Sequence, residues 1–269
     1  MQEQDGIKYY IIEEFRQTGL VKHAFTTRIG GVSSGDYVSL NLGLHVGDNE
    51  EDVLENRKRI CKLLGSNNEE LVATKQMHND RIKIVTQDDK GRGALTYHSA
   101  LDNFDALLTD QPGILLTSYY ADCTPILILD PKQKVIGLVH AGWKGTVKKI
   151  TQQAVLKMID SYGSKAEEIL VGVGPTIGSC CYEVDQQVIT PLANNFADWK
   201  QLVEKTGTTN WKLDLVLANK VQLEEIGLQE KNIINSELCT CCKSALFFSH
   251  RKEGGKTGRM ASLIKLKVD

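Results

Sequence analysis

Stretches typical of β-strands alternate with stretches typical of α-helices along most of this chain, and this alternation constrains the fold most strongly. Short apolar runs at 114–116, 126–129 and 135–139 are bounded by turn residues, as expected for buried strands. A tight turn at 130–133 would make the last two runs an antiparallel pair. We therefore expect one α/β domain, spanning residues 1–269, with a mixed sheet covered by helices.

Helical periodicity supports the same interpretation. Val53, Ile60, Cys61 and Leu64 would share one face of a helix, with Gly65 as its C-cap. The other expected elements are an amphipathic helix carrying Val147, Ile150, Ala154 and Met158 and ending near Gly163, a buried strand at 169–173, and helices near 186–196 and 215–226.

The composition excludes several classes of protein. The chain has 269 residues and a net charge of −2, so it offers no general basic surface for nucleic acid or an anionic membrane. No apolar run approaches the roughly 20 residues that span a bilayer, and the polar, acidic first residues are unlike an export signal. We expect a reducing cytoplasm, in which the seven cysteines are thiols or metal ligands rather than disulfides.

Three residues that can bind a soft metal lie where predicted strands end, namely His78, Cys123 and His140. Two imidazoles and a thiolate leave one position of a tetrahedral metal open, which is typical of a catalytic site. Their spacing matches no local zinc-binding motif, so the fold would have to bring them together. Zinc suits this donor set best in a reducing compartment, with copper as its competitor. Each residue could instead be an ordinary buried side chain.

Other roles are open for this region. Cys123 and His140 could form a thiolate–imidazolium pair for nucleophilic catalysis, a scheme that gives His78 no task. Asp122 is either a carboxylate that orients a ligand imidazole or a turn residue at a strand end. Lys75, three residues before His78, is either a general base or anion contact, or an ordinary exposed lysine.

A polar, glycine-rich loop at 26–35 contains Arg28. The backbone amides of Gly30 and Gly31, with the guanidinium, could form an anion-binding nest; an ordinary surface loop is an equally good interpretation. The glycines of 172–178 lack dinucleotide-binding spacing, and a P-loop ending near 256 would need a glycine where the chain has histidine, so both motifs are rejected.

Cys239, Cys241 and Cys242 form a dense group of thiols, and Cys180 and Cys181 are adjacent elsewhere in the chain. The group could bind a second metal, but we interpret it as lacking both C-x-x-C spacing and a clear second pair of ligands. We therefore interpret all five as structural or incidental thiols. The group also fails the deaminase signature, which needs H-x-E and P-C-x-x-C.

Two segments are highly specific in combination, A-D-C-x-P at 121–125 and H-A-G-W-K-G at 140–145. With shorter segments spread over almost the whole chain, they resemble the YfiH/YlmD family, also described as laccase-domain or polyphenol-oxidoreductase proteins and as purine nucleoside phosphorylases. The shorter segments are Thr26-Thr27-Arg28-x-Gly30-Gly31, Ser39-Leu40-Asn41, Asn56-Arg57, Gln76-Met77-His78, Gly174-Pro175-x-Ile177-Gly178, Tyr182-Glu183-Val184, Cys239-Thr240, and Phe248-Ser249-His250-Arg251 through Thr257-Gly258-Arg259.

This resemblance implies a single three-layer α/β/α domain with a mixed sheet, and a metal site made by His78, Cys123 and His140. It implies phosphorolysis of adenosine, inosine and S-methyl-5'-thioadenosine to a free base and a ribose 1-phosphate or its methylthio counterpart, with adenosine deamination as a side activity. The expected partners are therefore purine nucleosides and phosphate, with neither nucleic acid nor membrane. The oligomeric state is left open between monomer and homodimer.

The resemblance also assigns roles to single residues. Lys75 becomes a candidate proton-transfer group, beside Cys123 as the second candidate catalytic residue. Arg28 and Asn41 become candidate contacts to phosphate or ribose. His250 stands where many members have tyrosine, so no role is assigned to it.

Two other functions are kept as alternatives. A copper-dependent polyphenol oxidase is one, although multicopper sites need many histidines and this chain has six. A metal- or nucleoside-binding protein without catalysis is the other.

Overall fold

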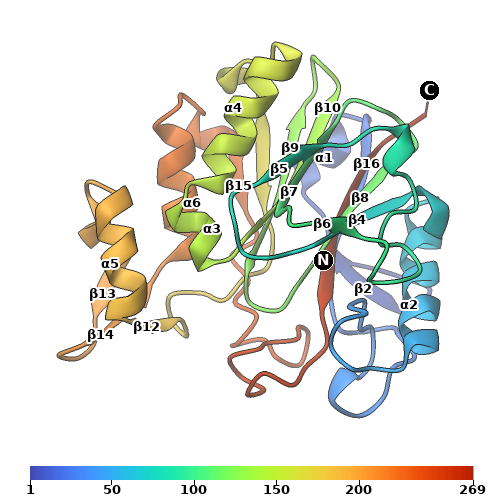
Figure 1. Cartoon of the computed structure of the whole chain (residues 1–269), viewed down its shortest axis with the longest axis horizontal. Helices are drawn as coiled ribbons and strands as arrows, with labels where there is room; N and C mark the ends of the chain where they lie inside the picture. Colours follow the sequence, from blue (N-terminus) through green and yellow to red (C-terminus); the bar gives the residue numbers. More distant parts are fainter. Residues whose placement is uncertain (269) are drawn as a thin grey trace.

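Two large β-sheets form the centre of the protein, and helices cover their outer faces (Figure 1). The computed structural model describes residues 1–268. The first sheet contains, in spatial order, β1 (Gln2–Gln4), β2 (Ile7–Tyr10), β3 (Val21–Thr26), β16 (Met260–Leu266), β8 (Leu115–Tyr120), β4 (Leu71–Lys75) and β6 (Leu101–Asp102). The second contains β15 (Ile233–Asn235), β11 (Leu170–Val173), β9 (Thr124–Asp130), β10 (Val135–Ala141), β7 (Ala106–Thr109) and β5 (Ile82–Ile84).

Both sheets are mixed, as predicted. In the first sheet β4 runs parallel to β8 and to β6, while the other neighbours are antiparallel. In the second sheet β5 is parallel to β7 and β11 to β15, while β9 pairs antiparallel with β10 and β11. The predicted turn between β9 and β10 is confirmed, with the Asp130 carboxylate accepting the backbone N–H groups of Lys132 and Gln133.

The two sheets face each other through one apolar layer. Phe25 of β3 and Ile264 of β16 belong to the same buried cluster as Leu127 of β9 and Leu138 of β10. Every residue of β9 and β10 is buried. The predicted α/β class is confirmed, but the strands lie in two facing sheets where one was expected. Continuous apolar runs indicate that both faces of a strand are covered, without indicating whether helices or strands cover them.

Helices close the outer faces. α2 (Glu50–Leu63) packs Ile60 and Cys61 on the first sheet. It is capped by Asn49, whose side chain accepts two backbone N–H groups, and it ends before Gly65, as predicted. On the second sheet α4 (Ile150–Tyr162) and α6 (Leu215–Glu224) contribute Met158 and Leu223 to a second apolar cluster. The short α1 (Glu13–Gln17) buries only Phe15.

One helix was expected from Val147 onward, but the structure has two helices in this region. α3 (Trp143–Val147) ends where the Lys149 N–H bonds the Thr146 carbonyl, and Lys149 has a left-handed φ of 59°. α4 then starts at Ile150 and is capped by Gly163, where the helix was predicted to end. Val147 and the buried residues of α4 pack in different apolar clusters, yet their spacing along the chain stays helical, so periodicity alone could not reveal the break.

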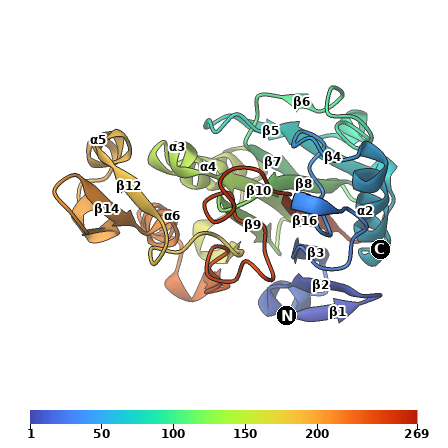
Figure 2. The same cartoon turned by 90° about the horizontal axis from the view of Figure 1, so that it is seen from below.

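A third, small sheet lies with α5 at one end of the molecule, beside α3 and α6 (Figure 2). Its strands are β12 (Glu183–Asp185), β14 (Asn210–Leu213) and β13 (Val203–Lys205), and α5 spans Gln186–Asn195. This unit has its own apolar cluster, which includes Leu192, Phe196 and Leu213. Within residues 1–268, no helix combines the length and apolar character that crossing a membrane requires.

Candidate metal site and its cavity

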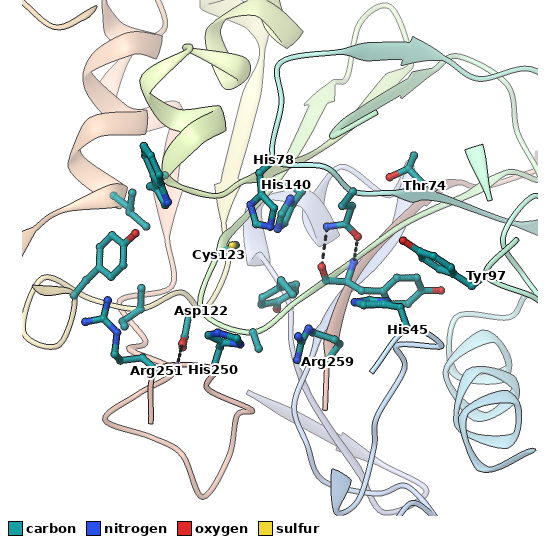
Figure 3. Close-up of a pocket in the computed structure, with 18 residues that line it drawn as sticks. His45, Thr74, His78, Tyr97, Asp122, Cys123, His140, His250, Arg251 and Arg259 are labelled. Atoms are coloured by element: carbon teal, nitrogen blue, oxygen red, sulfur yellow. Dashed lines mark hydrogen bonds between the residues drawn. The ribbon is translucent and has the colours of Figure 1, made fainter. Parts of the chain in front are cut away.

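His78, Cys123 and His140 meet where the two large sheets come together (Figure 3). His78 follows β4 in the first sheet, while Cys123 precedes β9 and His140 lies in β10 of the second. The ligand atoms of the three side chains all lie within 4.8 Å of one another, and the two imidazole centroids are 4.9 Å apart. The fold thus brings together the three candidate ligands that are far apart in the sequence.

The donor set and its surroundings fit a soft metal with an open position. Two imidazole nitrogens and one thiolate are typical ligands of catalytic zinc and also suit copper. Gly142 keeps the space between them clear, because a Cβ there would lie 2.6 Å from Nδ1 of His78 and 3.1 Å from Sγ of Cys123. Glycine is therefore required at this position if both donors are to converge.

A carboxylate that the sequence analysis did not single out organises both histidines. Asp105 is buried, and its Oδ1 lies 2.9 Å from Nδ1 of His140, which leaves Nε2 to face Cys123 or a metal. The same carboxylate accepts backbone N–H groups from Met77, His78 and Asn79 at 2.9–3.1 Å. These bonds stabilise the loop in which His78 has a left-handed φ of 56°. No local motif marks Asp105, since only strand pairing brings it to His140.

The three side chains form a strongly polarised group. Burial opposes ionisation of the Cys123 thiol, but the imidazoles of His140 and His78 lower its pKa to about 6. Burial likewise opposes a charge on His140, but Cys123 and Asp105 raise the pKa of its ring to about 10. In the metal-free protein a thiolate beside an imidazolium is therefore favoured near neutral pH, which keeps the sulfur in its metal-binding form.

The Asp122 carboxylate bonds neighbouring segments of the chain and does not orient an imidazole. Asp122 adopts a left-handed φ of 83°, and its carboxylate accepts the Thr240 hydroxyl at 2.6 Å and the Arg251 backbone N–H at 2.7 Å. Its carbonyl accepts the Thr176 hydroxyl and the Ile177 N–H. The turn interpretation therefore describes Asp122, and three separate segments fix the residue that precedes Cys123.

A cavity of about 450 Å³ opens beside the three candidate ligands. This volume is in the range of small-molecule sites. Its walls combine flat aromatic rings with two arginines and two further histidines; they include Tyr97, Tyr119, Trp143, Tyr182, Arg251, Arg259, His45 and His250. None of these residues was assigned a role from the sequence, although several lie in the segments that carry the family resemblance.

Gln76 connects the cavity wall to the first sheet. Its side-chain amide donates to the Tyr119 carbonyl and accepts the Tyr119 N–H, both at 2.8 Å. The amide thereby continues the pairing of β4 with β8 beyond the end of β4. This fixes the point at which the chain leaves the sheet and turns into the His78 loop.

Arg28 and Lys75 lie outside the cavity lining. The Arg28 guanidinium donates to the carbonyls of Val38 and Ser244, pairs with Glu253 at 2.8 Å and stacks on the Phe248 ring. Lys75 pairs with Asp102 at 2.7 Å. Nζ of Lys75 also lies 5.8 Å from the centroid of the Tyr97 ring, which lines the cavity. The phosphate or ribose contact expected of Arg28 and the proton transfer expected of Lys75 stay predictions.

Asn41 is also buried away from the cavity, but it holds a residue that lines it. Its Oδ1 accepts the backbone N–H of Arg259 at 2.8 Å and of Gly43 at 3.0 Å. Its Nδ2 donates to Asp48 at 2.9 Å. A Cβ on Gly43 would lie 2.8 Å from the Arg259 side chain. Asn41 and Gly43 therefore position Arg259, and Arg259 is the residue with access to a ligand.

The chain is similar to proteins of one family over nearly its whole length. A family model described as multi-copper polyphenol oxidoreductase laccase matches residues 22–267. "Purine nucleoside phosphorylase YlmD" of Bacillus subtilis is 38% identical over 261 residues, 96% of this chain and 94% of that protein. Its namesake in Geobacillus stearothermophilus is 41% identical over 240 residues, 89% and 88% of the two chains. The crystal structure of YlmD from Geobacillus stearothermophilus matches with a TM-score of 0.94 at 38% identity, covering 100% of this chain and 98% of that one. The expected resemblance to YfiH/YlmD proteins is confirmed, and the chain belongs to the multi-copper polyphenol oxidoreductase laccase family.

Proposed function

We propose that this protein is a metal-dependent purine nucleoside phosphorylase. It cleaves adenosine, inosine and S-methyl-5'-thioadenosine with phosphate, releasing the base and a ribose 1-phosphate or its methylthio counterpart. The observation that carries the proposal is the convergence of three metal-binding side chains with aromatic and cationic groups in one cavity. The name purine nucleoside phosphorylase borne by its relatives agrees with it.

His78, Cys123 and His140 would hold the metal, and we propose zinc, with copper as the competitor. A bound zinc ion would supply a Lewis acid and a site for activating water, chemistry suited to the accessory adenosine deamination that we also propose. Asp105 fixes the Nδ1 side of His140 and the backbone of His78, so the protein holds these donors in place before any metal arrives.

The cavity walls suit a purine and a phosphate. Tyr97, Trp143 and Tyr182 offer flat apolar faces on which a base can stack. Two arginines line the cavity, and among residues 1–268 each donates to protein carbonyls from Nη1 alone. Arg251 also lies over the Tyr182 ring, so Arg259 is the better placed cation for phosphate. Nε and Nη2 are then available for an anion. We therefore assign phosphate to Arg259 in place of Arg28, with Asn41 acting through Arg259.

Lys75 is the proposed proton donor to the departing purine. Lys75 can transfer a proton only when its ion pair with Asp102, at 2.7 Å, is broken. Asp102 is largely exposed, with 74% of its side chain accessible, so that pair lies at the solvent edge and can exchange.

Chromatography of inosine and adenosine reactions, with and without phosphate, tests the proposal. Metal-replete wild type should release hypoxanthine from inosine only with phosphate, and His78→Ala should not. Met77→Ala is the matched control, because that side chain is 60% exposed next to His78 and should leave turnover unchanged. No base from inosine in phosphate with the metal-replete wild type would refute phosphorolysis.

Two further measurements separate the alternatives. A copper polyphenol oxidase would instead consume oxygen with a phenol when loaded with copper. A metal- or nucleoside-binding protein would show thermal stabilisation by inosine without turnover.

A further inference from the structure

Four cysteines from two distant segments meet at the edge of the second sheet. Cys180 and Cys181 lie in the segment after β11, and Cys239 and Cys242 in the segment after β15. β11 and β15 are parallel neighbours, so both segments leave the sheet at the same edge. The four Sγ atoms all lie within 4.8 Å of one another. The fold thus supplies the second pair of ligands that was not evident in the sequence.

We propose that these four thiolates bind a second zinc ion, in a closed tetrahedral site separate from the cavity. Zinc–sulfur bonds of about 2.3 Å place the sulfurs of a tetrahedral site roughly 3.8 Å apart. Sγ of Cys242 lies 3.5 Å from Sγ of Cys180 and 3.4 Å from Sγ of Cys181. Small shifts of these side chains complete the tetrahedron.

The backbone around Cys239 has the form of a zinc-binding turn. Cys239 and Cys242 are three residues apart, which is the C-x-x-C spacing of structural zinc sites. The interpretation from the sequence that the group lacks this spacing was therefore wrong. Sγ of Cys239 accepts the backbone N–H of Cys242 at 3.5 Å and of Gly178 at 3.2 Å. Two such donors favour the thiolate over the thiol.

Space for the four sulfurs is preserved by a glycine. A Cβ on Gly178 would lie 3.2 Å from Sγ of Cys180 and 3.6 Å from Sγ of Cys239. Arg251 adds compensating charge, since its Nη1 donates to the Cys181 carbonyl at 3.3 Å. A zinc ion with four thiolates carries a net negative charge, so a nearby guanidinium is favourable.

Surface exposure also favours a metal over free thiols. Cys180 and Cys242 are exposed, so an ion can enter without unfolding of the sheet. Exposed thiols in close contact are open to oxidation, and coordination protects them. Four sulfur donors without an open position suit zinc in a structural role, in contrast to the open site of His78, Cys123 and His140.

The zinc ion would restrict the motion of two segments beside the cavity. Cys181 precedes Tyr182, which lines the cavity, and Cys239 precedes Thr240, whose hydroxyl bonds the Asp122 carboxylate. The proposed ion therefore stabilises, through two short connections, the turn that carries Cys123.

Zinc content and thiol protection in the full-length protein test the proposal. Wild type purified under reducing conditions, exposed to zinc and dialysed, should gain zinc that Cys242→Ser lacks, close to one ion per chain. Cys241→Ser is the matched control, because Cys241 is outside the group of four and should keep the wild-type content. His78→Ala should retain the cluster zinc, so this result is independent of whether the protein is a phosphorylase.

Alkylation of the wild type keeps the test decisive if Cys242→Ser does not fold. With zinc, iodoacetamide should leave Cys180, Cys181, Cys239 and Cys242 largely unmodified in peptide maps, and a chelator should expose them. X-ray absorption at the zinc edge of His78→Ala should show sulfur neighbours near about 2.3 Å. Equal zinc in wild type and folded Cys242→Ser, equal alkylation with and without zinc, or a disulfide in place of the ion would overturn the proposal.

Discussion

Oδ1 of Asp105 lies 2.9 Å from Nδ1 of His140, and the same carboxylate accepts the backbone N–H of His78. One buried side chain thus orients two candidate ligands from different sheets. Burial alone would raise the pKa of Asp105, but the bonds from His140 and the loop backbone lower it below its ordinary value. A permanently charged carboxylate at this point holds the ring of His140 in one orientation.

Asp105→Asn should weaken metal binding by about 10- to 100-fold, the usual effect of removing a carboxylate behind a ligand histidine. The asparagine side chain keeps the shape of the aspartate but loses its charge. Its NH₂ group would face the backbone N–H groups that the carboxylate accepts. Competition with a chromophoric chelator measures the effect. Asp102→Asn provides the same chemical change at an exposed position and should bind metal like the wild type. Equal affinity in the two variants would contradict this role of Asp105.

Gly142→Ala should abolish metal binding at the site of His78, Cys123 and His140 while the protein stays folded. The new Cβ would lie 2.6 Å from Nδ1 of His78, so the His78 side chain must move out of reach. The backbone at 142 has a φ of −66°, which alanine adopts freely, so little strain is expected elsewhere. Gly207→Ala, where the nearest atom is 3.9 Å away, is the control. Zinc analysis in the Cys242→Ser background, where the proposed cysteine site does not contribute, and circular dichroism together measure the effect. Zinc bound there by Gly142→Ala to the same extent as without this change would count against the site.

Arg259 and Arg28 should respond differently to replacement by glutamine. Arg259→Gln should raise the KM for phosphate by roughly 10- to 100-fold, because hydrogen bonds to a charged group contribute about 1.5–3 kcal/mol. Arg28→Gln should lower the melting temperature through loss of its pair with Glu253, with the KM for phosphate nearly unchanged. Steady-state kinetics at varied phosphate distinguish the two, and a larger KM effect at Arg28 would restore the role that the resemblance implied for it.

His23 predicts a loss of stability in mild acid. Its Nε2 accepts the Ile12 N–H at 2.8 Å, and burial lowers the pKa of the ring to about 4. Because the unfolded chain keeps a pKa near 6.5, it binds more protons than the folded chain between these values. The stability is complete above about pH 6.5 and falls by up to about 1.4 kcal/mol per pH unit toward about pH 4.

Urea unfolding at several pH values measures this dependence. His23→Gln, which can still accept the Ile12 N–H without titrating, should reduce the slope and leave the part that His45 contributes, since burial also lowers the pKa of His45 to about 4. The exposed His98 offers the control His98→Gln, which should keep the wild-type slope. An unchanged slope in His23→Gln would remove His23 as the source.

Much of the fold could be predicted from local patterns. The faces of α2, the antiparallel pair β9 and β10, and the ends at Gly65 and Gly163 depend on neighbouring residues, and each was expected. The division into two sheets was not predicted, because strand order depends on long-range pairing that periodicity does not encode. The break at Lys149 was missed because a single left-handed residue leaves the apolar spacing intact.

The residues of the candidate site also differ in whether they could be predicted from the sequence. His78, Cys123 and His140 could be singled out because their side chains carry metal-binding chemistry wherever they lie. Asp105 could not, since an aspartate before a strand is commonplace until β7 and β10 pair and place it at His140. Arg28 stood out for its glycine-rich loop, yet its guanidinium is engaged by Glu253 and two carbonyls.

The position of β16 has a consequence for how the chain folds. It lies between β3 and β8 in the first sheet, yet it follows every other strand in the sequence. Until it is inserted, β1–β3 have no hydrogen-bonded connection to the β8, β4 and β6 part of the sheet. A chain growing on the ribosome therefore carries two unpaired strand edges for most of its synthesis, and such edges are prone to associate with other chains. The same late strand follows Arg259 directly, so the cavity takes its final shape in the step that closes the sheet.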